Sequence, residues 1–125
     1  MNNINKNTIK IIAADDDPIT AIFWSKLLAT RPEYQITFVV NGKELLNSNW
    51  QHSDIIFTDI NMPEVDGITA AKEISSFCNA PIIGVTANHS EDVMKACLNA
   101  GIKQVLQKPL RPNTLAKLID IFTRK

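Results

Sequence analysis

The feature that most constrains the fold is a regular alternation between five short apolar runs and longer segments with helical periodicity. Several runs are nearly continuous in Ile, Val and Phe, as expected for parallel strands that are covered on both faces. Strict alternation of strands and helices predicts a doubly wound α/β fold, a five-stranded parallel sheet with right-handed crossovers. The predicted strands are Ile9 to Ala14, Ile36 to Val40, Ile55 to Thr58, Ile82 to Thr86 and Gln104 to Leu106.

The segments between these runs carry helix start and stop signals. Asp17-Pro18 and Asp66-Gly67 predict capped starts for the first and third helices, and a short second helix is predicted near 41–46. Gly101 can supply the left-handed turn that ends the fourth helix. Apolar stripes predict the core-facing sides of three helices: Ile19, Ile22, Phe23 and Leu27; Ile68, Ala71, Ile74 and Cys78; and Leu115, Leu118, Ile119 and Phe122.

Composition excludes several classes of protein. The chain has 125 residues, 45% of them hydrophobic, and 13 basic residues balance 13 acidic ones, so bulk charge gives no support to nucleic-acid binding. The polar start MNNINKNTIK lacks the apolar core of a signal peptide, and no apolar stretch approaches the roughly 20 residues that span a bilayer. We therefore expect a single cytoplasmic domain, residues 1–125, without membrane insertion. Cys78 and Cys97 show no metal-ligand spacing and are predicted to be reduced, packed thiols.

Polar residues stand at the ends of four of the five apolar runs. Asp15-Asp16-Asp17 follows the first run, Asp59 follows the third, Thr86 ends the fourth, and Gln107-Lys108-Pro109 follows the fifth. The carboxyl ends of parallel strands gather at one edge of a doubly wound sheet, where ligands bind. The sequence therefore predicts that the acids, the threonine and the lysine converge. This coincidence across four strands is a stronger signal than any one residue.

Each of these residues also has an ordinary interpretation. Thr86 alone would be a β-branched strand residue, Lys108 alone a surface lysine, and for Asp17 the favoured role is that of a helix cap. His52 and His89 lie in predicted loops without companion ligands, so solvated side chains are expected. Packing or loop-shaping roles are expected for Trp24, Trp50 and Pro63.

Electrostatics constrains what the acids can do together. Two unit charges about 4 Å apart at an effective dielectric near 20 interact by roughly 4 kcal/mol. Asp15, Asp16 and Asp59 would therefore repel one another strongly, and a single Lys108 cannot offset three carboxylates. Mg²⁺ accepts a few carboxylates and leaves room for phosphate oxygens, whereas an all-oxygen site without His or Cys argues against zinc. The sequence predicts a magnesium site.

Acids, Mg²⁺, a hydroxyl and a lysine in one crevice suit phosphoryl transfer to a carboxylate. Asp59 stands alone on the middle strand and is the best nucleophile. Asp15 and Asp16 are then metal ligands, direct or through water. Lys108 is expected to hold one phosphoryl oxygen, and the Thr86 hydroxyl another.

With these residues in view, the chain closely resembles the receiver domain of two-component response regulators. The stretches that carry the resemblance are IIAADDDP, DIIFTDINMPEVDG, PIIGVTAN and AGIKQVLQKPL, and they cover essentially the whole chain in order. The resemblance implies a flavodoxin-like (βα)5 fold with strand order 2-1-3-4-5. It implies that Asp59 is the phosphoacceptor, that Asp15 and Asp16 are the acidic pair, and that the backbone carbonyl of Asn61 is a further Mg²⁺ ligand. Lys108-Pro109 is a candidate cis peptide.

The resemblance also implies partners and a switch. A histidine kinase or a histidine phosphotransfer domain would donate the phosphoryl group, and Thr86 would move toward it. The phrases IIGVTAN and VLQKPLRPNTLAKLI resemble receivers of hybrid sensor kinases. Three residues before Lys108, where the family often has an aromatic ring, this chain has Val105, so signalling is expected to rest on Thr86, the loop after the fourth strand and the fourth helix. A monomer or weak dimer is expected.

Two other functions are compatible with parts of the sequence. A small phosphatase of the haloacid-dehalogenase type would use Asp15 as nucleophile, since Asp15-Asp16-Asp17 contains an Asp-x-Asp motif. That reading leaves Asp59 without a role, and the chain is short for that class. A receiver-like module that docks without phosphorylation is the second alternative. The receiver reading predicts no turnover of a separate substrate, only self-phosphorylation and autodephosphorylation.

Overall fold

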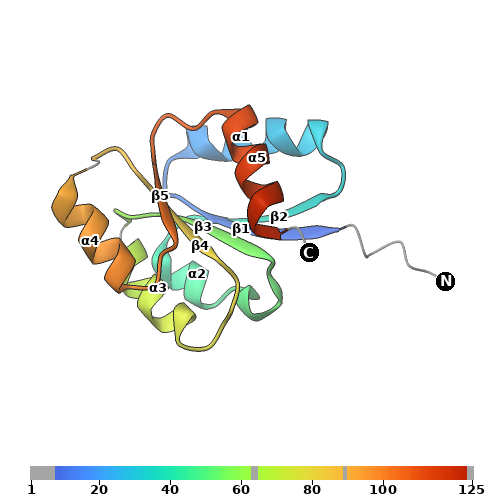
Figure 1. The fold of residues 1–125 in the computed structure, drawn as a ribbon. Coiled ribbons are helices and arrows are strands. Elements are labelled where there is room, and N and C mark those ends of the chain that lie inside the picture. Colours follow the sequence, from blue (N-terminus) through green and yellow to red (C-terminus); the bar gives the residue numbers. More distant parts are fainter. Residues whose placement is uncertain (1–7, 63–64, 89, 124–125) are drawn as a thin grey trace.

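The computed structural model describes residues 8–62, 65–88 and 90–123. These residues form a five-stranded parallel sheet in the order β2-β1-β3-β4-β5, flanked by helices (Figure 1). The strands are β1 (Ile9–Ala14), β2 (Tyr34–Val39), β3 (Ile55–Asp59), β4 (Ile82–Thr86) and β5 (Gln104–Gln107). The helices are α1 (Pro18–Thr30), α2 (Gly42–Leu46), α3 (Gly67–Ser75), α4 (Glu91–Asn99) and α5 (Pro112–Thr123), with a 3-10 turn, η2 (Trp50–His52). The predicted α/β class and strand order are confirmed.

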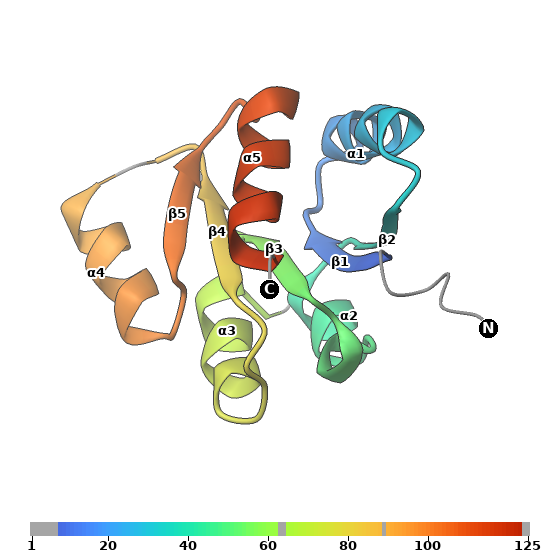
Figure 2. The ribbon, with the colours of Figure 1, turned by 45° about the vertical axis from the view of Figure 1, so that its right-hand side comes forward.

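The helices form two layers around the sheet. Figure 2 shows α1 and α5 on one face, with α2 and α3 on the other. Successive strand residues point to opposite apolar cores. Phe57 of β3 packs with Trp24 of α1 on the α1–α5 side, whereas its neighbour Ile56 packs with Ile74 of α3 on the α2–α3 side. The Trp24 and Phe57 rings lie 5.1 Å apart, between centroids. Both faces of β3 are therefore buried, as its continuous apolar run predicts.

One predicted core stripe is wrong in part. The side chains of Ile19 and Ile22 in α1 are 71% and 57% exposed, whereas Trp24 and Leu27 are buried. Helix α1 is apolar on several sides, so periodicity alone does not identify its inner face. The large Trp24 ring takes the inward position against Phe57, which turns the two isoleucines outward.

The other predicted stripes fit the structure better. Leu115, Leu118 and Ile119 of α5 are buried, and so are Ala71 and Ile74 of α3. Cys78 lies beyond the end of α3 at Ser75, and both Cys78 and Cys97 are free thiols.

The predicted caps are present. The Asp17 carboxylate accepts a hydrogen bond from the Ile19 amide at 3.0 Å, and Asp66 accepts one from Thr69 at 2.8 Å. Gly101 follows α4 with a φ of 95°. Asn41 caps α2 by accepting a hydrogen bond from the Glu44 amide at 2.7 Å.

The two tryptophans and His52 lie where the sequence predicts. Trp24 and Trp50 are buried, as expected of packing residues, and His52 is exposed at the end of η2. Pro63 and His89 lie outside the described residues. Across 8–62, 65–88 and 90–123, the helices are all too short or too polar to cross a bilayer.

Candidate functional site

The sheet order brings the acidic residues together. Strand β1 lies between β2 and β3, and its last residue, Ala14, is in register with Thr58 of β3. Asp15 and Asp16 therefore leave β1 beside Asp59, the final residue of β3. One carboxylate oxygen from each of these three residues lies within 4.8 Å of the other two. The predicted convergence of the three acids is confirmed.

Lys108 joins the same cluster from the end of β5. Its amine lies 2.9 Å from Asp15 Oδ2 and 3.1 Å from Asp59 Oδ2, so one ammonium contacts two carboxylates. The Lys108 amide donates to the carbonyl of Thr86 at 2.9 Å, which ties this segment to the end of β4. The Lys108–Pro109 peptide bond is cis, as predicted.

Burial dominates the electrostatics of Asp59, whose side chain is 9% exposed. Burial raises the pKa of this carboxyl above its ordinary value of 3.8, and the Asp15 carboxylate acts in the same direction. Hydrogen bonds from the Asn61 amide and from Lys108 lower the pKa but do not overcome burial. A buried carboxylate in this setting needs positive charge beyond what Lys108 supplies.

Lys108 remains a cation in this site. Burial alone would lower the pKa of its ammonium, but hydrogen bonds to Asp15 and Asp59 and the charges of both acids raise it above its ordinary value of 10.5. The cluster therefore combines three carboxylates with one ammonium.

Further hydrogen bonds fix the orientation of the two buried acids. Asp15 Oδ1 accepts from the Asp17 amide at 2.9 Å, and Asp59 Oδ1 accepts from the Asn61 amide at 3.1 Å. The hydrogen bond from the Asn61 amide to the Asp59 side chain closes a tight turn over residues 59–61 at the end of the strand. Asp16, by contrast, is exposed.

The donor set fits a hard divalent cation. All three clustered side chains offer oxygen, the atoms lie close enough to share one ion, and a cation would relieve the repulsion that Lys108 leaves. The cluster of Asp15, Asp16 and Asp59 thus suits Mg²⁺ and not a thiolate- or imidazole-binding metal.

Thr86 lies at this edge, and among the described residues its hydroxyl is hydrogen-bonded to Asn88 and not to Asp15 or Asp59. Its side chain is fully buried, and its hydroxyl is held by the Asn88 backbone, donating to the carbonyl at 3.1 Å and accepting from the amide at 3.0 Å. Val105 is buried in the apolar cluster of the α2–α3 side, which also includes Ile60 and Ile102.

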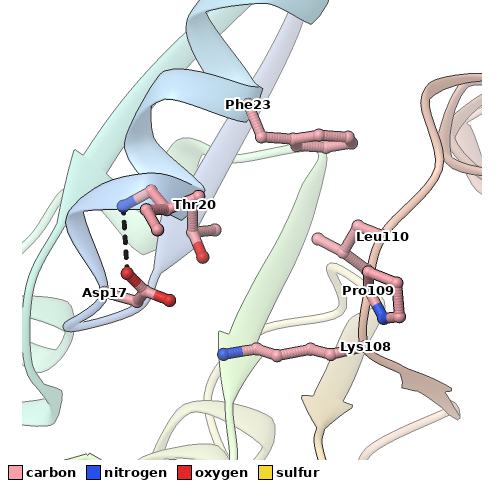
Figure 3. Close-up of a pocket in the computed structure, with 7 residues that line it drawn as sticks. Asp17, Thr20, Phe23, Lys108, Pro109 and Leu110 are labelled. Atoms are coloured by element: carbon pink, nitrogen blue, oxygen red, sulfur yellow. Dashed lines mark hydrogen bonds between the residues drawn. The ribbon is translucent and has the colours of Figure 1, made fainter.

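An apolar hollow adjoins the acidic cluster. Its volume is about 380 Å³, and in Figure 3 Asp17, Thr20 and Phe23 face Pro109 and Leu110 across it, with the Lys108 side chain extending between them. The sequence does not predict the α1 side of this hollow, because the apolar stripe places Ile19 and Phe23 in the core. A signal for it is present in the sequence: α1 carries more apolar residues than one buried face needs, so some of them must lie outside the core. The lining residues are Asp17, Ile19, Thr20, Phe23, Lys108, Pro109 and Leu110.

Known proteins share both the sequence pattern and the fold. The sensor histidine kinase RcsC of Escherichia coli is 28% identical over 123 residues, which cover 97% of this chain and 13% of RcsC. The sensor protein EvgS of Escherichia coli O157:H7 is 31% identical over 109 residues, covering 86% of this chain and 9% of EvgS. The chain thus spans only a small part of the length of these curated relatives.

A solved structure with the same fold also contains a metal. The receiver domain of the sensor histidine kinase PA1611 from Pseudomonas aeruginosa PAO1 has a magnesium ion coordinated in its active-site cleft. It superposes with a TM-score of 0.84 at 28% identity, covering 94% of this chain and 99% of that chain. The sequence model of the response regulator receiver domain family matches residues 11–120. The chain therefore belongs to the response regulator receiver domain family, whose members are phosphoacceptor switches of two-component signalling.

Proposed function

We propose that Asp59 is the residue that accepts the phosphoryl group, and that a phosphohistidine on a partner protein donates it. The observation that carries this assignment is the position of Asp59 as the last residue of β3, the middle strand of the sheet, beside the ends of β1 and β4. It is the buried acid that shares Lys108 with Asp15 and lies within 4.8 Å of both other carboxylates. A phosphoryl group entering at Asp59 would meet the ammonium directly.

The proposed reaction is an in-line displacement at phosphorus. A carboxylate oxygen of Asp59 forms a bond to phosphorus while the bond from phosphorus to the donor imidazole nitrogen breaks, and that nitrogen keeps the electron pair. We assign Asp15, Asp16, Asp59 and the backbone carbonyl of Asn61 as the residues that would hold Mg²⁺. When bound, the ion supplies positive charge that neutralises the transferred oxygens.

Lys108 and Thr86 are assigned to the phosphoryl oxygens after transfer. The Lys108 ammonium already lies 3.1 Å from Asp59, so it needs little movement to contact a phosphoryl oxygen. Thr86 must first release the Asn88 backbone, to which its hydroxyl is bonded. In the proposed switch, the Thr86 hydroxyl exchanges its hydrogen bonds to the Asn88 backbone for one to a phosphoryl oxygen. This exchange would rearrange the segment that leads from β4 toward α4.

The two alternative functions are less well supported. A haloacid-dehalogenase-type phosphatase would attack with Asp15, and it would leave without a role the carboxylate of Asp59, which is buried at the same site and also contacts Lys108. The family match over residues 11–120 favours the receiver reading instead. A module that only docks has no need for the two buried acids, Asp15 and Asp59, whose burial is unfavourable for folding.

The acceptor assignment is tested by labelling with a small phosphodonor. Asp59→Asn should abolish Mg²⁺-dependent labelling by acetyl phosphate, with a loss of at least about 1,000-fold, because the amide is not a nucleophile of this kind. The measurement is the phosphorylated fraction by intact-protein mass spectrometry, with the site located by peptide analysis. Asp54→Asn is the matched control, since Asp54 directly precedes β3 and therefore lies at the opposite end of that strand from Asp59.

Labelling at another residue in the wild-type protein, or full labelling of Asp59→Asn, would contradict the assignment. Equal labelling in excess chelator would contradict the metal assignment alone, because it would show that Asp59 accepts the phosphoryl group without the ion.

We further propose that the donor protein docks on the hollow and the adjoining α1 face. The exposed isoleucines, Phe23 and Leu110 give an apolar surface beside Lys108, which suits a helical histidine phosphotransfer domain or histidine kinase. Such a partner would bring its phosphohistidine to the acidic cluster. The chain is proposed to act in the cytoplasm as a monomer or weak dimer, as the receiver of a hybrid kinase or as a separate regulator.

The docking surface is tested by comparing two donors. Ile22→Glu should slow transfer from a phosphorylated histidine phosphotransfer domain at least about tenfold, because it places a charge in a dry apolar contact. Labelling by acetyl phosphate should not change. Ile121→Glu on α5 is the control, since Ile121 is 70% exposed and lies near the far end of that helix from the site. Equal slowing by both variants would contradict this docking face.

A further inference from the structure

Thr58 is a polar residue in an apolar environment. It lies directly before Asp59 in β3, is fully buried, and shares its face of the strand with Ile56 and Ile60 of the α2–α3 core. The Asp59 side chain points to the opposite face, toward α1 and α5. A valine would have nearly the same shape as Thr58 and would suit these neighbours better, so packing alone does not explain the hydroxyl.

The hydroxyl of Thr58 donates to the backbone carbonyl of Asp59 at 3.0 Å. The same carbonyl oxygen lies against the start of α3, since a Cβ added to Gly67 would lie 2.1 Å from it. The carbonyl is thus bound by Thr58 and confined by the Gly67 backbone. Together these contacts limit rotation of the peptide plane that joins Asp59 to Ile60.

That peptide plane determines where the reactive groups lie. Two residues later, the Asn61 amide donates to Asp59 Oδ1, and the Asn61 carbonyl is an assigned Mg²⁺ ligand. A rotation of the plane would move the Asp59 carboxylate relative to Lys108 and would turn the Asn61 carbonyl away from the acids. A second hydrogen-bond layer commonly orients metal ligands in this manner.

We propose that Thr58 is a positioning residue for the phosphoryl-transfer site, acting through its hydroxyl on the Asp59 carbonyl. The proposal rests on the assignment of Asp59 as the phosphoacceptor. It assigns a function to a side chain that does not touch the reacting atoms and lies on the other face of the strand. It predicts that the polar group, not the shape of the side chain, matters at position 58.

Two substitutions separate the hydroxyl from the shape. Thr58→Val keeps the branched shape and removes the hydroxyl, whereas Thr58→Ser keeps the hydroxyl and removes a methyl group. For Thr58→Val we expect about a tenfold loss of Mg²⁺ affinity and a similar loss in the rate of labelling by acetyl phosphate, as is typical when a ligand loses an orienting partner. For Thr58→Ser both quantities should stay within about twofold of wild type, although it leaves a small cavity in the core.

Thr30→Val is the matched control, because the Thr30 hydroxyl also donates to a backbone carbonyl, that of Leu27 at 2.9 Å, but at the end of α1 away from the acids. Mg²⁺ affinity is measured by calorimetric titration, and the folded fraction by circular dichroism. If Thr58→Val does not fold, Thr58→Ala provides the same comparison with the hydroxyl absent and less bulk.

Wild-type affinity and labelling rate in Thr58→Val would overturn the proposal, and so would equal losses in Thr58→Ser and Thr58→Val. Failure of the wild-type protein to label at Asp59 is a different result. It would refute the acceptor assignment, while the Mg²⁺ titrations would still decide whether Thr58 orients the acidic site.

Discussion

The two edges of the sheet hold polar groups in opposite ways. At the carboxyl edge, Asp15 and Asp59 are buried as charges, and Lys108 contacts both. At the amino edge, neutral serine side chains donate to backbone carbonyls, and the Asp54 carboxylate accepts from the Lys10 amide at 2.8 Å in an exposed hydrogen bond. Ser75 donates to Ala100 at 3.0 Å, and Ser53 donates to Trp50 at 2.7 Å.

The different polar contacts at the two edges indicate that one edge serves function and the other serves stability. Neutral pairs at the amino edge satisfy buried carbonyls at little desolvation cost, so they hold helices and turns in place. Buried charges at the carboxyl edge are unfavourable until a cation neutralises the excess of carboxylates. One departure from the pattern at the amino edge is Tyr34, whose buried hydroxyl has no partner among the described residues. The carboxyl edge is therefore built for a ligand and the amino edge for cohesion.

The largest expected effect on stability comes from two glycines, one at each edge. An alanine at 67 would place its Cβ 2.1 Å from the Asp59 carbonyl oxygen, and one at 101 would place it 2.6 Å from Ser75 at a φ of 95°. Each substitution should lower the free energy of unfolding by about 3 kcal/mol, since at 67 the Asp59 backbone must shift and at 101 an alanine would crowd Ser75 at a strained φ. Only Gly67→Ala should also weaken Mg²⁺ binding, by tenfold or more. Urea unfolding and calorimetric titration measure the two quantities.

The two variants control for each other, because their losses of stability are expected to be similar. An equal loss of Mg²⁺ affinity in Gly101→Ala would mean that general loosening, and not the position of the Asp59 backbone, governs the site. Unchanged Mg²⁺ affinity in Gly67→Ala would show that the turn at 59–61 adapts without moving its ligands.

Much of the fold could be predicted because its signals are local. The apolar runs, the caps at Asp17 and Asp66 and the glycine at 101 each reflect backbone chemistry within a few residues. The inner face of α1 could not be predicted in the same way. That face is decided by how Trp24 packs against Phe57, which is 33 positions later in the chain, and apolar residues on several sides of the helix allow more than one rotation.

The site shows the same division. The convergence of Asp15, Asp16, Asp59 and Lys108 follows from strand ends, because parallel strands place their carboxyl ends together. The two hydroxyls could not be placed so easily. Thr86 is paired with Asn88 and Thr58 with the Asp59 carbonyl, and both contacts depend on local turn geometry that residue spacing does not specify.

A smaller effect tests the charge at the carboxyl edge directly. The pKa of Asp59 is raised by burial, so the folded protein binds this proton more tightly than the unfolded chain does. Stability associated with that proton is present below the ordinary value of 3.8 and is lost as the pH rises through the raised pKa. At neutral pH without Mg²⁺, Asp59→Asn should therefore be more stable than wild type by on the order of 1 kcal/mol, as when other buried charges are replaced by neutral groups. Urea unfolding as a function of pH measures the difference.

Mg²⁺ should reverse this order, because binding to the folded state alone stabilises it. At about 100 times its dissociation constant the ion adds about 2.7 kcal/mol to the wild-type protein. Asp59→Asn retains only Asp15 and Asp16 of the clustered carboxylates and should gain much less. Asp54→Asn, just before the opposite end of β3, should show no such crossing. A variant that is less stable than wild type in chelator would mean that the loss of the Lys108 contact outweighs the relief of buried charge. The carboxyl edge would then be as cohesive as the amino edge, and the distinction between them would fail.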